Sequence, residues 1–366
     1  MYASRRKGLP FFCQQLPSRT SEQSQKHRRN IAETKQLDHR VLHTLEGYMM
    51  RVKQIGWIFV IAILMAISAC GSTEISSRAA SPIAVTTPAD TPNGNTVDPA
   101  RLLIGDTFVR TTSASAGYAF VCNAANPGAG GATTKGPWFN SDGKTWNSLT
   151  KQVVSGVVSW ASQFTAMVTG STRNASGNGL PSHTTGTFPV PSADAVYAFD
   201  RNPNRISAQT IAWGLPSNPA VSATPTCLNS GAIGVLLTGV RLFAPTDALN
   251  RDAVAWEGQD SCQGHPERTG QYHYHSISSC LSQGSETRDT TGQHSPLVGY
   301  AADGFGIYGN LGESGLALTN ANLDECHGHT HSVVINGVST IQYHYHKTLE
   351  FPYALGCYRG TPVGVN

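Results

Sequence analysis

Two copies of the pentapeptide Gln-Tyr-His-Tyr-His, at residues 271–275 and 342–346, place paired histidines where they could bind a metal ion. Alternating tyrosine and histidine residues are typical of a β-strand, on which every second side chain points to the same face. The two histidines of each copy would then share a face, about 7 Å apart at Cα, while the tyrosines pack into the core. The paired residues are His273 with His275 and His344 with His346.

A loop with the pattern Asp-x-Cys-x-Gly-His precedes each pentapeptide and supplies a third histidine, His265 in the first half and His329 in the second. A disulfide from the loop cysteine to the region after each strand would bring that histidine near the pair. Three histidines are a common ligand set for zinc or copper, with a fourth position left open. Asp260 and Asp324 would either orient a histidine ring or serve as turn residues.

The number of metal ions stays open, because six histidines could form two sites of three or one site shared on a pseudo-twofold axis. Further candidate ligands are His183, His294, His327 and His331. The abundance of imidazole and the lack of Met-rich segments favour copper(II) or zinc(II) over copper(I). A structural network of tyrosines and histidines, or a pocket for an organic ligand, is the alternative.

Residues 239–280 and 304–357 share a series of features in the same order. Each stretch begins with a glycine and a short apolar run, and the Asp-x-Cys-x-Gly-His loop, the pentapeptide and a later cysteine follow. This order predicts an internal duplication. Two copies are too few for a solenoid, so we expect a pseudo-twofold arrangement inside one domain.

The six cysteines after residue 70 indicate three disulfides in an exported chain. The repeat favours the pairs Cys262–Cys280 and Cys326–Cys357, which leaves Cys122 with Cys227. Cysteine ligation of a metal is the alternative. The sequence has no Cys-x-x-Cys motif, so neither a zinc ribbon nor a thioredoxin-like site is indicated.

Residues 50–69 have the pattern of a signal peptide: a short basic start, an apolar run too short to span a membrane, and small residues before Cys70. We expect a lipoprotein signal peptidase to cut before Cys70, and the lipidated cysteine to anchor the protein at the cell envelope. An ordinary membrane anchor helix is the alternative. Because a signal peptide should begin a chain, we expect residues 1–49 to be a non-native or disordered extension, with the true start at Met49 or Met50.

Residues 70–100 are rich in Ser, Thr, Ala and Pro, which is typical of a flexible tether, and residues 101–366 remain as the folded domain. The basic balance of the chain belongs to residues 1–69, which hold 11 of the 26 Lys and Arg and 4 of the 23 Asp and Glu. The rest of the chain has a net charge near −4. Binding to nucleic acid is therefore not indicated, and the membrane, reached through the lipid anchor, is the expected partner.

Short apolar runs between Gly, Pro, Ser and Thr predict a mostly β, antiparallel domain, a sandwich or barrel-like core with long loops. The runs lie at 211–219, 232–245 and 331–346, and the last contains Asn336-Gly337, a strong hairpin signal. Residues 149–168 could be one helix, but their Val, Ser, Thr and Gly content suits strands as well.

Several segments together resemble the YHYH-domain family, a group of exported proteins named for this motif. They are NGLPSHTTGTFPV (178–190), DRNPN (200–204), DAVAWEGQDSCQGHP (252–266), QYHYHS (271–276), HSPLVGYAADGFGIYG (294–309), LDECHGH (323–329) and YHYHKTLEFPYALGCYRG (343–360). The resemblance covers most of 101–366. It supports the domain boundary and the repeat, and it implies no particular reaction.

Three functions fit these residues. The first is an extracytoplasmic lipoprotein that binds copper or zinc through the duplicated histidines. The second is a metal-dependent hydrolase or oxidase on the same ligands, with Asp260, Asp303 or Asp324 as the general base. The third is a surface module without metal that binds a glycan or another protein.

Overall fold

The structure, a computed structural model, describes residues 97–126, 132–282, 294–335 and 338–365. They all belong to one unit of the chain, Thr86–Asn366. The expected signal peptide, Cys70 and most of the tether lie outside the described residues. Within the described ranges, no helix is long and apolar enough to cross a membrane.

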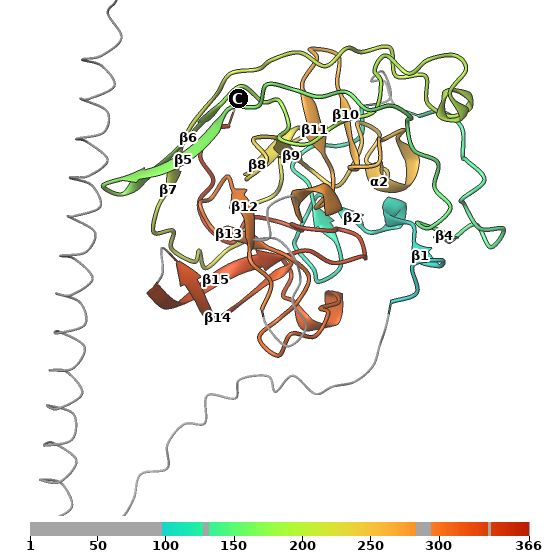
Figure 1. Ribbon diagram of the computed structural model, residues 1–366. Helices are drawn as coiled ribbons and strands as arrows, with labels where there is room; N and C mark the ends of the chain where they lie inside the picture. The colour runs from blue at the N-terminus through green and yellow to red at the C-terminus, as the bar shows by residue number, and fades with distance from the viewer. Residues whose placement is uncertain (1–96, 127–131, 283–293, 336–337, 366) are drawn as a thin grey trace, which may run out of the picture. The chain divides into compact units, whose positions relative to one another are not determined.

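An eight-stranded mixed sheet forms the centre of the domain (Figure 1). Its spatial order is β10 (Gly264–Pro266), β11 (Tyr272–Tyr274), β9 (Arg241–Phe243), β8 (Ala232–Leu236), β12 (Leu297–Ala301), β13 (Gly306–Tyr308), β15 (Val338–His346) and β14 (Gly328–Ile335).

Strand directions repeat outward from the central pair β8 and β12. On each side the central strand pairs antiparallel with the next strand (β9 or β13). That strand pairs parallel with the strand of the pentapeptide (β11 or β15), which in turn pairs antiparallel with the edge strand. The two halves of the sheet therefore carry their pentapeptides in equivalent positions.

The prediction of an antiparallel core is wrong for two strand pairs: β9 with β11 and β13 with β15 are parallel. Parallel neighbours need a long crossover, and the chain supplies one on each side, between residues 243 and 272 and between residues 308 and 338. The barrel alternative is not realised either. Among the described residues, β10 and β14 form the two edges of an open sheet.

Smaller elements surround this sheet. They are β1 (Leu102–Leu103) with β4 (Thr145–Trp146), β2 (Val109–Arg110) with β3 (Ala119–Phe120), the three-stranded sheet β5 (Phe164–Thr169), β6 (Thr172–Gly177) and β7 (Ile211–Pro216), the helix α2 (Ala253–Trp256), and the 3-10 turns η1 (Gly105–Thr107), η2 (Ala195–Ala198), η3 (Ser279–Ser282) and η4 (Asn320–Asn322). Trp213 and Leu215 of β7 pack with Val235 of β8, so the three-stranded sheet covers part of the large one. Residues 149–168 form no helix; part of this stretch enters β5.

The hairpin predicted around Asn336-Gly337 is present as the antiparallel pair β14 and β15, which closes at Ile335 opposite Val338. The two turn residues themselves lie outside the described ranges. This hairpin brings the loop histidine and the pentapeptide of the second half onto adjacent strands.

Two disulfides join the pairs that the repeat favoured, Cys262–Cys280 and Cys326–Cys357, and a third joins the remaining pair, Cys122–Cys227. The main core lies behind the pentapeptide strands and includes Tyr272, Tyr274, Tyr343 and Tyr345 together with aliphatic residues of β8, β9, β12 and β13. The tyrosine face of each pentapeptide therefore packs inward, as the alternation predicts.

Candidate metal centres

The first histidine cluster, called cluster A, consists of His265, His273 and His275. His265 lies on β10 directly opposite His273 on β11. Residues that face each other across an antiparallel pair have their side chains on the same face. Strand pairing, and not the disulfide alone, therefore brings the loop histidine to the pair.

A glycine precedes the loop histidine in both halves, because a tyrosine side chain of the adjacent strand occupies the space that a side chain at this position would need. A Cβ on Gly264 would lie 2.2 Å from the ring of Tyr272, and one on Gly328 would lie 2.4 Å from the hydroxyl of Tyr343. Any side chain in place of either glycine would therefore have to displace a buried tyrosine. The Gly-His dipeptide thus lets β10 and β14 approach the pentapeptide strands closely.

The second histidine cluster, called cluster B, is larger than a mirror copy of cluster A. It contains His294, His329, His331, His344 and His346. His329 on β14 faces His344 on β15, as His265 faces His273. Two of the additional candidates from the sequence, His294 and His331, complete this cluster. The structure thus separates the six main histidines into two sites of three and enlarges the second site.

Backbone carbonyls set the tautomer of most of these histidines. The Nδ1 atoms of His275, His346 and His294 lie 2.5, 2.6 and 2.6 Å from the carbonyl oxygens of Ala244, Gly309 and Ser295. A carbonyl oxygen can only accept, so Nδ1 carries the proton and Nε2 keeps its lone pair. The same holds for His273 and His344, whose Nδ1 atoms face carbonyls two residues earlier. A histidine held in this way is ready to bind a metal through Nε2.

The Nε2 atoms of each cluster lie close to one another. The Nε2 atoms of His273 and His275 are 3.1 Å apart. In cluster B the corresponding distances are 2.9 Å between His329 and His331 and 3.3 Å between His294 and His344. Nitrogen ligands about 2.0–2.1 Å from a tetrahedral ion lie about 3.3 Å from each other. These spacings fit nitrogens around one cation.

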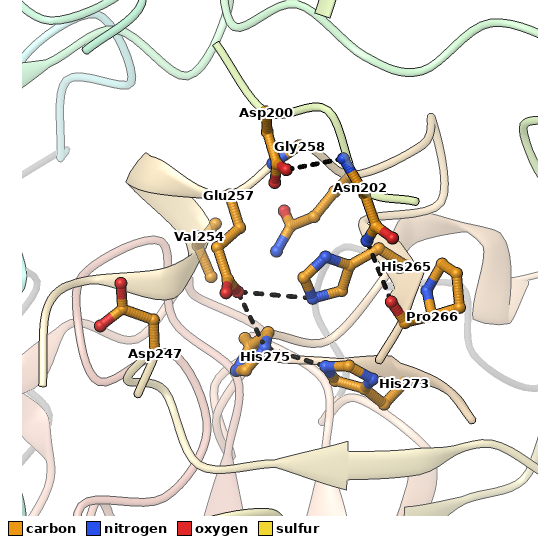
Figure 2. Close-up of polar contacts among 12 residues, drawn as sticks. Asp200, Asn202, Asp247, Val254, Glu257, Gly258, His265, Pro266, His273 and His275 are labelled. Carbon is orange, nitrogen blue, oxygen red and sulfur yellow. Dashed lines mark hydrogen bonds and ion pairs between the residues drawn. The ribbon is translucent and has the colours of Figure 1, made fainter. Parts of the chain in front are cut away.

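The carboxylate of Glu257 lies beside cluster A (Figure 2). Its Oε2 is 3.2 Å from Nε2 of His275 and 3.4 Å from Nε2 of His265, and the figure joins it to these two rings and not to His273. Helix α2, whose N-terminus is capped by Asp252, ends just before this residue. Lys151 donates hydrogen bonds to the carbonyl oxygens of Val254 and Glu257 at the end of that helix.

Burial controls the protonation of the clusters. It lowers the pKa of His344 to about 2, that of His329 to about 3 and that of His294 to about 4, and neighbouring histidines add to the effect. In cluster A burial also holds the pKa of His265 and of His273 well below the ordinary value.

His275 is the exception in cluster A, because its pKa is raised and not lowered. Burial alone would lower the pKa of His275, but the adjacent Glu257 carboxylate raises it above the ordinary value. Burial alone would raise the pKa of Glu257, but His275, His273 and Lys151 together lower it below its ordinary value. Cluster A therefore contains a buried histidine and a buried carboxylate that shift each other's pKa, whereas the carboxylate beside cluster B, that of Glu313, is half exposed.

The two loop aspartates lie on the tyrosine side and act as turn residues. Asp260 accepts hydrogen bonds from the backbone amides of Cys262 and Gly264 and from the hydroxyl of Tyr272. Asp324 repeats this pattern with the amides of its own loop and with Tyr343. Asp260 and Asp324 therefore serve as turn residues and do not orient a histidine ring.

Asp303, the third carboxylate considered as a general base, is also on the tyrosine side. It accepts hydrogen bonds from Tyr345 and from the amide of Gly360. None of the three aspartates is therefore placed against a histidine cluster, and the carboxylate that is so placed in cluster A is Glu257.

Two histidines considered as further ligands serve other purposes. His183 contacts the hydroxyl of Tyr274, with Nε2 2.5 Å from that oxygen. His327 has a left-handed backbone (φ 74°), like Gln263 at the same place in the first loop (φ 62°). Its ring turns away from cluster B toward Ala354 and Thr348. Cys262 and Cys280 lie near His183 but are joined to each other, so they offer no thiolate to a metal.

Cluster A opens onto a cavity of about 990 Å³. All three histidines of the cluster line it together with Glu257, and Phe243 stacks on His273 with ring centroids 3.9 Å apart. A metal ion at cluster A would therefore be reachable by a molecule in this cavity.

Two carboxylates beside the clusters were not predicted from the sequence. Glu257 lies beside cluster A, and the Oε1 atom of Glu313 lies 3.0 Å from Nδ1 of His331 in cluster B. Glu257 had one usable signal: it is the single acidic residue directly after the apolar run Ala253–Trp256. A charged side chain next to such a run is buried only when it has partners. Glu313 is half exposed and had no such signal.

Comparison with known proteins adds one match. Residues 212–321 fit the family model described as YHYH protein. The match spans β7 to η4, including all of cluster A and Glu257, and ends before the second pentapeptide. No curated protein and no solved structure matches the chain.

Proposed function

Residues 212–321 are a YHYH protein family domain, and from this premise and the two histidine clusters we propose that the protein binds transition-metal ions, one at each cluster. The observation that carries the proposal is the convergence of Nε2 lone pairs. The clearest case is the pair His294 and His344: both rings are held neutral by burial, both direct Nδ1 at a carbonyl oxygen, and their Nε2 atoms, 3.3 Å apart, have no proton to share between them. A cation at that point would satisfy both.

The donor set supports zinc(II) or copper(II). Imidazole nitrogens suit both ions, and neither cluster contains a thiolate or a thioether that would select copper(I). Burial keeps most of the rings neutral at physiological pH, which is the form that binds a metal.

We place this activity outside the cytoplasm. Three disulfides favour an oxidising compartment. The signal peptide and the lipid anchor at Cys70 are read from the sequence alone and remain part of the proposal. The equal order of strand pairings on both sides of β8 and β12 also supports an origin of the two halves by internal duplication.

Metal content tests the proposal. The full-length protein, purified without a polyhistidine tag or chelator, should carry about two equivalents of zinc or copper. The double variant His273→Ala/His275→Ala should lose one equivalent, and His344→Ala/His346→Ala should lose the other, with folding verified by circular dichroism.

The matched control is His327→Gln, which puts in the second loop the residue that the first loop has at Gln263. This variant should keep both equivalents. A native protein that stays metal-free after incubation with zinc and copper, or double variants that bind as much metal as the wild type, would contradict the proposal.

A further inference from the structure

The two clusters differ in their number of donors. Cluster A offers three imidazoles, whereas cluster B offers five. Three nitrogens leave at least one position of a four-coordinate ion free, whereas four or five can fill it. The duplicated strands therefore carry sites of unequal coordination.

The cavity lies at the cluster with fewer donors. His265, His273 and His275 all line the space of about 990 Å³. Both ring nitrogens of His265 and the Oε2 atom of Glu257 are buried without a hydrogen-bond partner of good geometry. Buried polar atoms are rarely left so, and these lie where a metal ion and its further ligand would sit.

Glu257 is placed to accept a hydrogen bond from a ligand in the cavity. Its Oε2 contacts His265 and His275, and the three histidines form a mutually close group that does not include it. The cavity's other carboxylates are committed: Asp200 accepts from the amides of Gly258 and Asn202, Asp247 pairs with Arg251, and Glu267 accepts from the amides of Thr269 and Gln271. Glu257 is thus the carboxylate available to a molecule bound at the open position.

We propose that cluster A holds its metal with an exchangeable position that faces the cavity and takes a small oxygen ligand bearing a proton, such as a hydroxamic acid, an alcohol or water, whose hydroxyl hydrogen bonds to Glu257. Cluster B holds its metal closed to such ligands. This inference rests on the proposed metal binding and assigns the two sites different roles: a ligand-binding centre and a structural one.

Cobalt(II) and acetohydroxamate provide the test. The metal-free full-length protein is loaded with cobalt and titrated with acetohydroxamate, and the visible spectrum of the bound cobalt is followed. The spectral change should persist in His344→Ala/His346→Ala, which keeps cluster A, and should be absent in His273→Ala/His275→Ala, which keeps cluster B.

A carboxylate swap tests the role of Glu257. Glu257→Gln should retain the cobalt but weaken acetohydroxamate binding by roughly 10- to 100-fold, since a hydrogen bond to a charged acceptor is lost. The matched control is Glu313→Gln, which removes the carboxylate beside His331 of cluster B and should leave the affinity unchanged.

The outcomes separate the two proposals. No bound cobalt at either cluster overturns metal binding itself. Cobalt at both clusters with a spectral change that follows cluster B, or with none, leaves metal binding intact and overturns this inference. Loss of cobalt in Glu257→Gln would make Glu257 a metal ligand, and an unchanged affinity in that variant would remove it from the site; either result contradicts the role assigned here.

Discussion

Tyrosines of the two pentapeptides hydrogen bond to the aspartates of the loops that precede them. Tyr272 reaches both oxygens of Asp260, at 3.0 and 2.9 Å, and Tyr343 reaches Asp324 at 2.9 Å. The alternation of the motif predicts that tyrosines and histidines occupy opposite faces, because this follows from strand geometry alone. It does not predict which carboxylate each tyrosine meets, because that depends on how the loop folds back.

Removing one tyrosine hydroxyl should destabilise the fold without affecting the metal. Tyr272→Phe takes a hydrogen bond from Asp260, which is fully buried, and should lower the free energy of unfolding by about 2 kcal/mol. Tyr343→Phe should have a smaller effect, because the side chain of Asp324 is 26% exposed and water can replace the hydroxyl. Urea unfolding measures both changes. An equal loss of unfolding free energy in the two variants would contradict the argument from the exposure of Asp324. Loss of metal from cluster A in Tyr272→Phe would contradict the separation of the tyrosine and histidine faces.

At the level of elements, the position of the third histidine depends on strand pairing. The sequence predicts the hairpin of β14 and β15 and the disulfides, because the turn signal and the repeat are local or ordered along the chain. It does not predict the parallel pairing of β11 with β9, because that contact closes across a long crossover containing α2. Glu257 enters the site through the same crossover, so its role was equally hidden.

The disulfide of the first half should therefore stabilise the fold more than it shapes the site. Cys262→Ala/Cys280→Ala opens a loop of 18 residues and should lower the free energy of unfolding by about 3 kcal/mol. Because His265 is held opposite His273 by the β10–β11 ladder, the variant should still bind metal at cluster A. Chemical unfolding and metal analysis of the same sample measure the two effects. A variant that folds but has lost that metal would show that the disulfide sets the histidine position.

At the level of the whole molecule, Asp252 joins three segments that are far apart in the sequence. Its carboxylate accepts hydrogen bonds from the amide of Gly105, from the amide of Ala255 in α2 and from the hydroxyl of Tyr353. Sequence patterns could not predict this junction, because no periodicity links residues more than 100 positions apart. Burial, partly offset by these hydrogen bonds, raises the pKa of Asp252 to about 6.

Stability should consequently fall as pH rises through this carboxyl's titration. The unfolded chain has the ordinary pKa of 3.8, so between about pH 4 and 6 the folded state binds more protons than the unfolded state. Asp252→Asn removes this titration, and the stability of the wild type relative to the variant should decline by about 2–3 kcal/mol across the interval. Urea unfolding of both metal-free proteins from pH 3.5 to 7 gives the difference. Parallel curves would mean that Asp252 titrates at its ordinary value.

The placement of three donors of each cluster on one pair of adjacent strands has a consequence for the order of assembly. His265, His273 and His275 lie within eleven residues, and the closure of so short a loop costs little conformational entropy. If a cation binds cluster A as proposed, its three ligands need only the β10–β11 hairpin, and the parallel pairing of β11 with β9 is not required. Each hairpin would then carry a complete ligand set of its own, so a chain with two such hairpins would have two separate centres.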